Sequence, residues 1–356
     1  MKNKLFFSFI FGVLSALSCA NLWPADIQAQ FESPQFRYRY VSLDAALPTG
    51  FTFFAEPMKI TDAGRVYLTA YACDIFCSTS IVTYQRGTVK IIQQNAIPYD
   101  VNSSGVIGGS AFDAINGIEQ AAFFDDGAVK LLARMPGEVT SHVMRITDSG
   151  IALVQWSDDS DVHYYTYRHG KASRLDFGAR QVGFLDINDE GIIAGTLFGN
   201  GGIDRGFRLN PSSGKLTVLN PLPTEPASWG QAINSQHDVL GYSFIPGKLE
   251  RIGVWHGEKF STYIVEGTPQ FPTISNQLLW NRRGLIVITN TSRSDLNSYL
   301  VPKPGTRLNL ADLVETLPRW TLIESVNQRG DLVGIGGSSY FNGENTFLLE
   351  RIDAAR

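Results

Sequence analysis

A short acidic segment followed by a histidine is the first feature of the sequence that can do chemistry. Asp158, Asp159 and Asp161 stand within four residues, and His163 follows two residues later. Carboxylate oxygens are ligands that Ca²⁺ prefers, so the three aspartates form a candidate calcium site. The glycine spacing of an EF-hand is missing, which favours a solvated acidic loop as the simpler interpretation. Beside these carboxylates, His163 is a candidate for ligand binding or proton transfer.

Three tryptophans and two arginines are further candidates for ligand binding. An exposed indole stacks on sugar rings or peptide side chains, and a guanidinium pairs with acidic groups. The candidates are Trp156, Trp229, Trp320, Arg205 and Arg251. The alternative for the tryptophans is burial between structural units. Because Asp204 precedes Arg205 and Glu250 precedes Arg251, surface ion pairs are the alternative for the arginines.

Two cysteines stand close together in the chain. Cys73 and Cys77 enclose only three residues, so a disulfide between them would pin one small loop. Two free thiols are the alternative, since a metal site would need two more ligands from elsewhere. The sequence has no HExxH, GxSxG, paired CxxC or phosphate-binding glycine loop. We therefore predict no catalytic residue and no cofactor, with calcium as the one exception considered.

A sevenfold repeat must position these residues. Each copy reads as an apolar residue, Asn or Thr, two further residues and Gly, followed by an apolar strand. Successive copies are 41 to 47 residues apart, and their Asn or Thr residues are Thr61, Asn102, Thr147, Asn188, Asn234, Asn281 and Asn327. Asn favours the first position of a type I turn, and Gly accepts the positive φ that follows. The phrase thus predicts a tight hairpin, although the fifth copy has His237 in place of Gly.

Each repeat is predicted to contain four short strands. In the fourth copy these are Val182–Ile187, Ile192–Leu197, Gly206–Leu209 and Leu216–Leu219. Repeated four-stranded units of roughly 40–50 residues are typical of β-propellers. Long helical patterns are absent from the sequence, which argues against an alternating α/β fold.

The two ends of the repeat region predict how the ring closes. The seventh copy has no fourth strand after Thr346–Ile352, and Arg37–Leu43 precedes the first hairpin without a partner. We therefore predict an all-β, seven-bladed propeller of four-stranded antiparallel blades, with the last blade completed by the N-terminal strand. This pairing would remove a free sheet edge. An open β-solenoid is the alternative, and it would leave Arg37–Leu43 unpaired.

Propeller geometry also predicts where ligands bind. The tight turns lie on one face, whereas the longer connections lie on the other. Variable loops on a rigid scaffold are the usual location of binding residues. We therefore expect a site on the long-loop face, around the mouth of the central channel.

The phrase I-N-x-x-G-x-I-x-G, followed by a small residue and an apolar or aromatic one, resembles the HAF repeat of bacterial extracellular proteins. The resemblance is carried by Val101–Gly109 with Ala121–Phe124, Ile187–Gly195 with Gly206 and Phe207, and Ile233–Gly241 with Gly253–Trp255. It covers nearly all of the chain after residue 36, but Ala-Ala-Phe, Arg-Gly-Phe and Ile-Gly-Val replace His-Ala-Phe. The resemblance implies export and a propeller-like repeat, and the family has no agreed biochemical activity.

The N-terminus carries the features of an export signal. Met1–Lys4 is basic, and the uncharged apolar run Leu5–Leu17 is shorter than the roughly 20 residues of a transmembrane helix. We predict a signal peptide at 1–20, a linker at 21–36 and one propeller domain at 37–356. Export to the periplasm or the medium follows, with lipidation of Cys19 as the alternative to cleavage after Ala20.

Composition narrows the range of partners. The chain has 356 residues, 30 basic against 34 acidic side chains and a net charge of −4, which argues against nucleic-acid binding through bulk charge. No later segment predicts a transmembrane span, and we expect a monomer. The sequence favours an exported, non-catalytic module that binds a glycan, a peptide or a cell-envelope protein. The alternative is a carbohydrate-active enzyme, a lyase or hydrolase, with acidic residues at the channel mouth.

Overall fold

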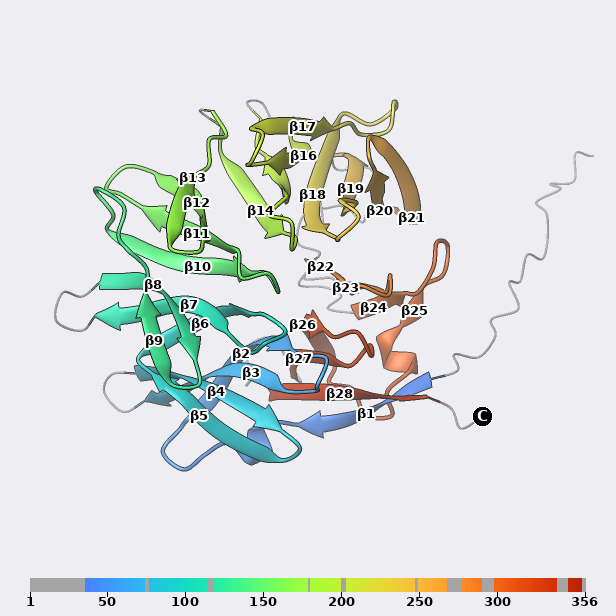
Figure 1. The fold of residues 1–356 in the computed structure, drawn as a ribbon. Helices are drawn as coiled ribbons and strands as arrows, with labels where there is room; N and C mark the ends of the chain where they lie inside the picture. Colours follow the sequence, from blue (N-terminus) through green and yellow to red (C-terminus); the bar gives the residue numbers. More distant parts are fainter. Residues whose placement is uncertain are drawn as a thin grey trace, which may run out of the picture. The chain divides into compact units, whose positions relative to one another are not determined.

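Seven four-stranded antiparallel sheets follow one another around a ring (Figure 1). The computed structural model describes residues 36–73, 77–113, 118–178, 180–199, 203–246, 249–267, 277–289, 298–337 and 345–353. Phe36–Arg356 forms one compact unit, whereas the predicted signal peptide and residues 21–35 of the predicted linker lie outside the described residues. The predicted seven-bladed propeller is confirmed.

Within each blade the first strand lines the channel and the fourth lies at the rim. Blade 1 is β2 (Phe53–Ile60), β3 (Val66–Cys73), β4 (Cys77–Gln85) and β5 (Thr88–Gln94). Blade 2 is β6 (Ala96–Val101), β7 (Ile107–Asp113), β8 (Ile118–Asp125) and β9 (Ala128–Leu131). Blade 3 is β10 (Thr140–Ile146), β11 (Ala152–Ser157), β12 (Val162–Arg168) and β13 (Lys171–Arg174). Blade 4 is β14 (Val182–Ile187), β15 (Ile193–Leu197), β16 (Arg205–Asn210) and β17 (Lys215–Leu219).

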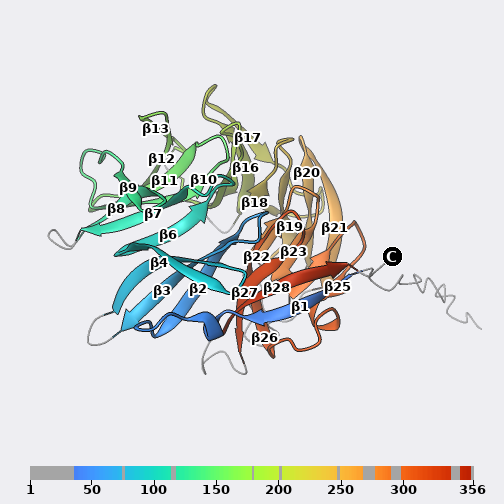
Figure 2. The same cartoon turned by 60° about the horizontal axis from the view of Figure 1, so that its bottom comes forward.

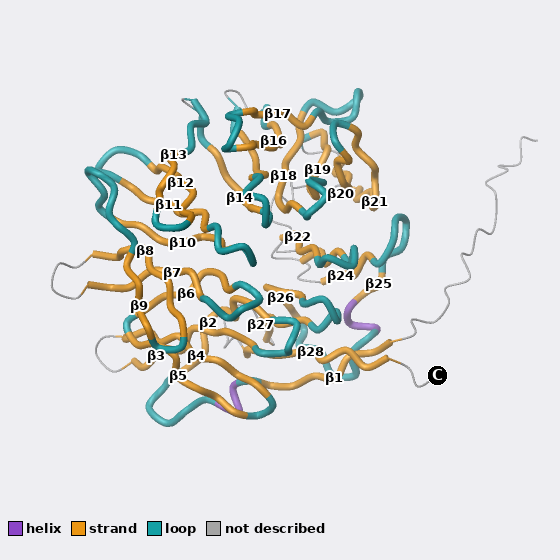
Figure 3. The backbone as a smooth tube through the Cα atoms, viewed as in Figure 1, coloured by secondary structure: helices purple, strands orange, loops and turns teal. Residues whose placement is uncertain are grey.

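The remaining blades have the same order. Blade 5 is β18 (Ala227–Ile233), β19 (Val239–Ile245), β20 (Leu249–His256) and β21 (Lys259–Gly267). Blade 6 is β22 (Gln277–Trp280), β23 (Ile286–Thr289), β24 (Ser298–Val301) and β25 (Leu308–Asn309). The described helices are two 3-10 turns, η1 (Asp44–Ala46) and η2 (Leu310–Asp312), and the rest is strand and loop (Figure 3). In this part of the chain no helix has the length and apolar character that a membrane span needs.

The N-terminal strand closes the ring. Blade 7 consists of β26 (Trp320–Val326), β27 (Leu332–Gly337), β28 (Asn345–Asp353) and β1 (Phe36–Ser42), in that order. All seven residues of β1 pair with β28, from Phe36 opposite Asp353 to Ser42 opposite Phe347, and Figure 2 shows the two strands side by side. The predicted closure is confirmed, and the open solenoid is ruled out.

Apolar contacts between neighbouring blades form the core. The second strand of a blade is buried on both faces, as in β15 and β27, because each face packs against an adjacent sheet. One buried cluster joins Leu240 and Ile252 of blade 5 to Ile286 and Val301 of blade 6. The core is therefore a ring of interfaces, and each blade depends on its neighbours for burial.

Steric crowding explains why the last position of the repeat phrase I-N-x-x-G-x-I-x-G is glycine. A β-carbon at Gly241 would lie 1.9 Å from the Trp229 carbonyl oxygen, and one at Gly109 would lie 2.1 Å from that of Ile97. At this point the inner strand bulges toward its neighbour. Six of the seven inner ladders shift register there, for example between Gly230 and Ala232. Bulges re-aim side chains, and here they set the residues that face the channel.

The repeated Asn joins blades as well as forming turns. In blade 6, Asn281 Oδ1 accepts hydrogen bonds from the backbone N–H groups of Arg283 and Leu285, both at 3.0 Å. Its amide nitrogen donates to the Asn327 carbonyl oxygen of blade 7 at 2.9 Å. Asn327 in turn donates to the Thr61 carbonyl oxygen of blade 1 at 3.1 Å. One side chain therefore stabilises its own hairpin and the seam beside it.

Replacing Asn281 with Thr should lower the free energy of unfolding by about 1–2 kcal/mol, because the bond across the seam is lost. Thr occupies the same repeat position in blades 1 and 3, where Thr147 Oγ1 still accepts the Ile151 N–H at 2.9 Å, so the turn itself should survive. The reverse change, Thr147→Asn, should add up to about 1 kcal/mol by reaching the carbonyl of the next blade. Urea unfolding measures both. If Asn281→Thr were as stable as the unchanged protein, the hydrogen bond across the seam would not contribute to the free energy of unfolding.

Candidate ligand-binding channel

A central channel passes through the ring, lined by the inner strands and tight turns of all seven blades. Its volume is about 1510 Å³, above the roughly 300–1,000 Å³ of ordinary small-ligand pockets. The residue two places before each repeat Asn or Thr lines this channel, and the set is Lys59, Asp100, Arg145, Asp186, Ala232, Leu279 and Ser325. Blades 1 to 4 thus contribute charges of alternating sign, whereas blades 5 to 7 contribute uncharged side chains.

The charged residues pair around the channel wall. Lys59 Nζ lies 2.6 Å from Asp100 Oδ1, and Arg145 Nε lies 3.6 Å from Asp186 Oδ1. Lys59 and Arg145 keep 36% and 45% of their side chains exposed, so each cation has surface left to meet a ligand. Burial raises the pKa of Asp186, and the positive charge of Arg145 opposes that rise. We call these four residues the charged stripe.

The same ring of residues also joins the blades. Asp100 Oδ2 accepts the Ile146 N–H of blade 3 at 2.9 Å, and Asp186 Oδ2 accepts the Ile233 N–H of blade 5 at 2.9 Å. Uncharged acceptors do this elsewhere: Ser325, at the same repeat position, accepts from the Ile60 N–H at 3.2 Å, and Gln231, one residue before that position, accepts from the Leu278 N–H at 3.1 Å. An acceptor at or beside this position therefore holds the inner strand of the next blade.

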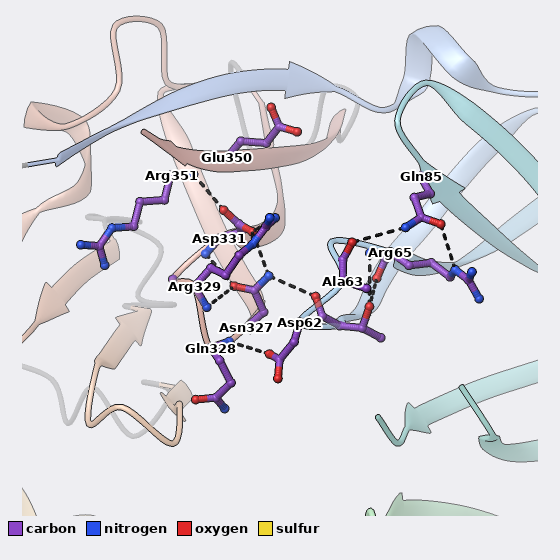
Figure 4. A network of polar contacts seen from close by, with 12 residues as sticks. Asp62, Ala63, Arg65, Gln85, Asn327, Gln328, Arg329, Asp331, Glu350 and Arg351 are labelled. Carbon is purple, nitrogen blue, oxygen red and sulfur yellow. Dashed lines mark hydrogen bonds and ion pairs between the residues drawn. The ribbon is translucent and has the colours of Figure 1, made fainter. Parts of the chain in front are cut away.

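At one mouth of the channel, aspartates of the tight turns also accept backbone N–H groups from neighbouring blades. Asp62 accepts the Gln328 N–H at 2.8 Å (Figure 4), Asp148 accepts the Ser103 N–H at 2.7 Å, and Asp189 accepts the Asp148 N–H at 2.8 Å. Each contact crosses from one blade to its neighbour. All five aspartates that line the channel thus accept a backbone hydrogen bond from another blade.

Arg282 crosses this mouth. The guanidinium of Arg282, on blade 6, pairs with Asp148 of blade 3 and lies 3.3 Å from Asp189 Oδ2 of blade 4. Burial opposes the ionisation of Asp148, but the Ser103 N–H and the Arg282 guanidinium outweigh it and lower the pKa of that carboxyl. The tight-turn mouth is therefore spanned by a side chain.

The Arg282 contact should contribute stability only while Asp148 is ionised. Because the folded-state pKa of Asp148 is below its unfolded value near 3.9, this contribution is present above that pH and is lost as pH falls through the folded pKa. Arg282→Gln should cost no more than about 1 kcal/mol at pH 7, since the arginine is well exposed. The stabilities of the two proteins from urea unfolding should converge as pH falls below the unfolded value. A difference that persists or grows in acid would contradict the assignment.

An aromatic pair stands on the channel wall between blades 2 and 3. The rings of Tyr99, from β6, and His142, from β10, stack with centroids 4.5 Å apart and an interplanar angle of 23°. Tyr99 lines the channel and keeps 36% of its surface exposed. Burial lowers the pKa of His142, so the imidazole is neutral at pH 7. The sequence did not indicate this pair, because its members come from different blades.

The acidic segment singled out from the sequence does not line the channel. His163 Nε2 lies 2.8 Å from Asp158 Oδ2, and the imidazole packs on Trp156 with ring centroids 4.3 Å apart. Asp158 Oδ1 accepts the Ser160 and Asp161 N–H groups at 2.8 Å, and these bonds lower its pKa. Asp158 thus anchors its own loop.

The candidate calcium site gains no geometric support. Across the residues described, no three His, Cys, Asp or Glu side chains are arranged to hold a metal ion, and this includes Asp158, Asp159 and Asp161. The reason is the turn itself, in which one aspartate is used to hold the backbone.

The three candidate tryptophans are core residues, which corrects the expectation of exposed stacking platforms. Trp156, Trp229 and Trp320 are 5%, 6% and 5% exposed. Trp229 packs on Phe184 of blade 4 and donates from Nε1 to Asp204 Oδ2 at 2.9 Å. Trp156 belongs to a buried cluster that joins blades 2 and 3, and Trp229 to one that joins blades 5 and 6, so a large ring fills each interface.

The two candidate arginines also hold the fold together. Arg205 donates to the carbonyl oxygens of Asp204, at 2.9 Å, and Pro226. Arg251 Nε donates to Glu225 Oε1 at 2.6 Å, and the Glu225 side chain is completely buried. The expected pairing of Arg251 with its neighbour Glu250 is therefore replaced by a contact with the loop that precedes β18.

The cysteine loop is described only in part. Cys73 is disulfide-bonded, and the backbone of Cys77 lies directly opposite it in the ladder of β3 and β4. This register fits the bridge predicted from the spacing. The side chain of Cys77 lies outside the described part.

Comparison with known proteins identifies a fold and not a family. No protein-family model matches the chain, and no curated protein matches its sequence. Among solved structures, the β-propeller domain of the Trilobed protease from Pyrococcus furiosus aligns with a TM-score of 0.59 at 9% identity, covering 86% of this chain and 98% of that one. A streptogramin B lyase aligns with a TM-score of 0.53 at 14% identity, covering 89% and 98%.

A third similar structure is a puromycin-hydrolyzing peptidase of Mycobacterium tuberculosis, with a TM-score of 0.56 at 13% identity. The match covers 90% of this chain and 54% of the peptidase, so this chain corresponds to about half of that protein. At such identities the likeness shows the propeller fold alone, because one fold serves unrelated functions. Lyases and peptidases that share the scaffold do not assign an activity here.

Proposed function

We propose that the chain is an exported, non-catalytic binding module that takes a glycan, a peptide or a cell-envelope protein from its long-loop face into the central channel. The opposite mouth is spanned by Arg282, which favours entry from the long-loop face. Two parts of the proposal, export and the relationship to HAF-repeat proteins, rest on the sequence pattern alone.

One observation carries the choice of binding over catalysis. Every aspartate that lines the channel accepts a backbone N–H from a neighbouring blade, and Glu324 is the one other acidic residue in the described part of the wall. A catalytic acid or base needs a proton position directed at substrate, within hydrogen-bond reach of it. These carboxylates are directed at the seams between blades, which suits a rigid receptor more than an acid–base pair.

The residues proposed for the alternative, a lyase or hydrolase, do not lie at the channel. Asp158, Asp159, Asp161 and His163 do not line the channel, and Asp158 holds its own loop. An enzyme reading would therefore need a different set of groups.

A glycan and peptide array probed with the purified full chain tests the proposal. We expect retention of a restricted set of ligands and no conversion of those ligands on prolonged incubation. Mass spectrometry of the recovered ligands checks the second point. A blank array would count against the binding module, and cleaved or eliminated products would favour the enzyme.

A further inference from the structure

We propose that the channel binds the end of a neutral oligosaccharide chain, with sugar hydroxyls on the charged stripe and a sugar ring against Tyr99. The inference rests on the proposed function, because it names the ligand of that same channel. It is carried by the charges, the aromatic wall and the closed mouth, each of which limits the ligand in a different way.

The charged stripe selects a neutral ligand. Lys59, Asp100, Arg145 and Asp186 alternate in sign around four blades and sum to zero, and the other charged residues of the described channel wall are mostly acidic, which disfavours an anionic ligand. A charged ligand group would gain from one neighbour what it loses to the next. The stripe offers donors and acceptors side by side instead, and both cations remain partly exposed with N–H groups to spare.

Vicinal hydroxyls match such a stripe better than peptide groups do. A hydroxyl both donates and accepts, so two adjacent hydroxyls can accept from Arg145 and donate to Asp186 from one side of a sugar ring. A peptide group points its N–H and C=O in opposite directions, so one group cannot meet neighbouring residues of the same wall. Charge-assisted hydrogen bonds of this kind are also the stronger ones.

The rest of the wall suits the apolar face of a sugar. Tyr99 presents a ring to the channel and is backed by the neutral imidazole of His142, which holds the ring in place. Across the channel, Ala232 and Leu279 occupy the positions that are charged in blades 1 to 4. A pyranose with hydroxyls on its rim and C–H groups on its face fits a site that combines charged and polar groups with aromatic and aliphatic surface.

Length and closure indicate binding at a chain end. A volume of about 1510 Å³ is more than a single sugar fills, which favours several linked units. Arg282 joins opposite sides of the tight-turn mouth through Asp148 and Asp189, so a chain entering from the long-loop face stops there. The ligand therefore has one free end inside the channel.

Isothermal titration of the full chain with maltohexaose, cellohexaose, chitohexaose and mannohexaose tests the inference. We expect at least one to bind, and Tyr99→Ala and Arg145→Met each to weaken it by about tenfold or more. Phe112→Ala is the matched control, because Phe112 is 49% exposed but does not line the channel, and it should leave affinity within about twofold. Circular dichroism and urea unfolding of each variant separate lost binding from lost fold.

A second measurement tests the chain end. The hexasaccharide that binds is coupled to a bulky dye at one end or at both ends. One blocked end should be tolerated and two should abolish binding, whereas equal binding of both conjugates would overturn recognition of an end.

The outcomes distinguish this inference from the proposed function. If short neutral peptides bind, and Tyr99→Ala and Arg145→Met weaken them while no hexasaccharide binds, the sugar inference is wrong and channel binding stands. If sugars bind without any effect of the two variants, the ligand lies outside the channel and the inference is overturned. If neither class binds at about 10 mM, the sugar inference is wrong, since even weak specific sites would register there, and a cell-envelope protein remains as the ligand of the proposed function.

Discussion

Tyr38→Ala is expected to lower the free energy of unfolding by about 3–5 kcal/mol, the range for a large buried ring replaced by alanine. Tyr38 lies in the middle of β1, is 4% exposed and packs among residues of blades 6 and 7. Its hydroxyl donates to the Gly330 carbonyl oxygen at 2.8 Å, and its N–H donates to the Leu313 carbonyl oxygen at 2.9 Å. The side chain thus fastens the strand that closes the ring.

Tyr38→Phe is the matched control for this prediction. It keeps the ring and removes only the bond to Gly330, so the loss should be about 1 kcal/mol. Urea unfolding followed by tryptophan fluorescence measures both variants. A loss below about 1 kcal/mol for Tyr38→Ala would mean that the ring holds without its N-terminal strand.

Arg251→Met is expected to cost about 3–5 kcal/mol, because it leaves a buried carboxylate without its counter-charge. The Glu225 side chain is completely buried and has two partners, Arg251 and the hydroxyl of Ser243. The hydroxyl alone cannot replace the positive charge. Arg251 itself keeps part of its surface exposed, so the penalty lies with the glutamate.

The double variant Arg251→Met with Glu225→Gln separates charge from packing. Removing both charges should recover at least half of the loss, because a neutral amide can still bond to Ser243. The comparison is made by urea unfolding at pH 7. If the double variant is less stable than Arg251→Met, the uncompensated charge is not the cause.

Local patterning is the reason that the fold could be predicted from the sequence. Asn188 and Gly191 specify one hairpin through contacts within four residues, and the phrase recurs seven times. Blade 7 lacked a fourth strand, and the strand at Arg37–Leu43 lacked a partner. Pairing the two predicted how the ring closes, and β1 does pair with β28. In the fifth copy His237 adopts the same positive φ as the glycines, so the turn survives the substitution.

The site could be predicted only where the repeat carried it. Lys59, Asp100, Arg145 and Asp186 occupy one repeat position with alternating charge, and comparison of the copies could have found them. Arg282 gives no such signal, because its partner Asp148 is 134 residues away in the chain.

Residue type alone misled the choice of binding residues. The tryptophan residue type does not distinguish an exposed platform from burial between blades, and Trp229 adopts the second, filling the interface of two blades. Among the described aromatic residues that line the channel, Tyr99 is the most exposed, and it follows a proline at a bulge and matches no part of the repeat phrase. Its neighbour His142 joins it only when the ring is formed.

The stability of Asp100→Ala and Asp186→Ala tests most directly whether the channel carboxylates hold the ring together. Each aspartate pairs with a cation and accepts the N–H of the next blade, so each variant should lose about 1.5–3 kcal/mol in urea unfolding. Catalytic groups behave differently, because their replacement commonly leaves stability unchanged or raised. A loss in this range supports a rigid binding channel, and unchanged or higher stability in both variants would contradict it.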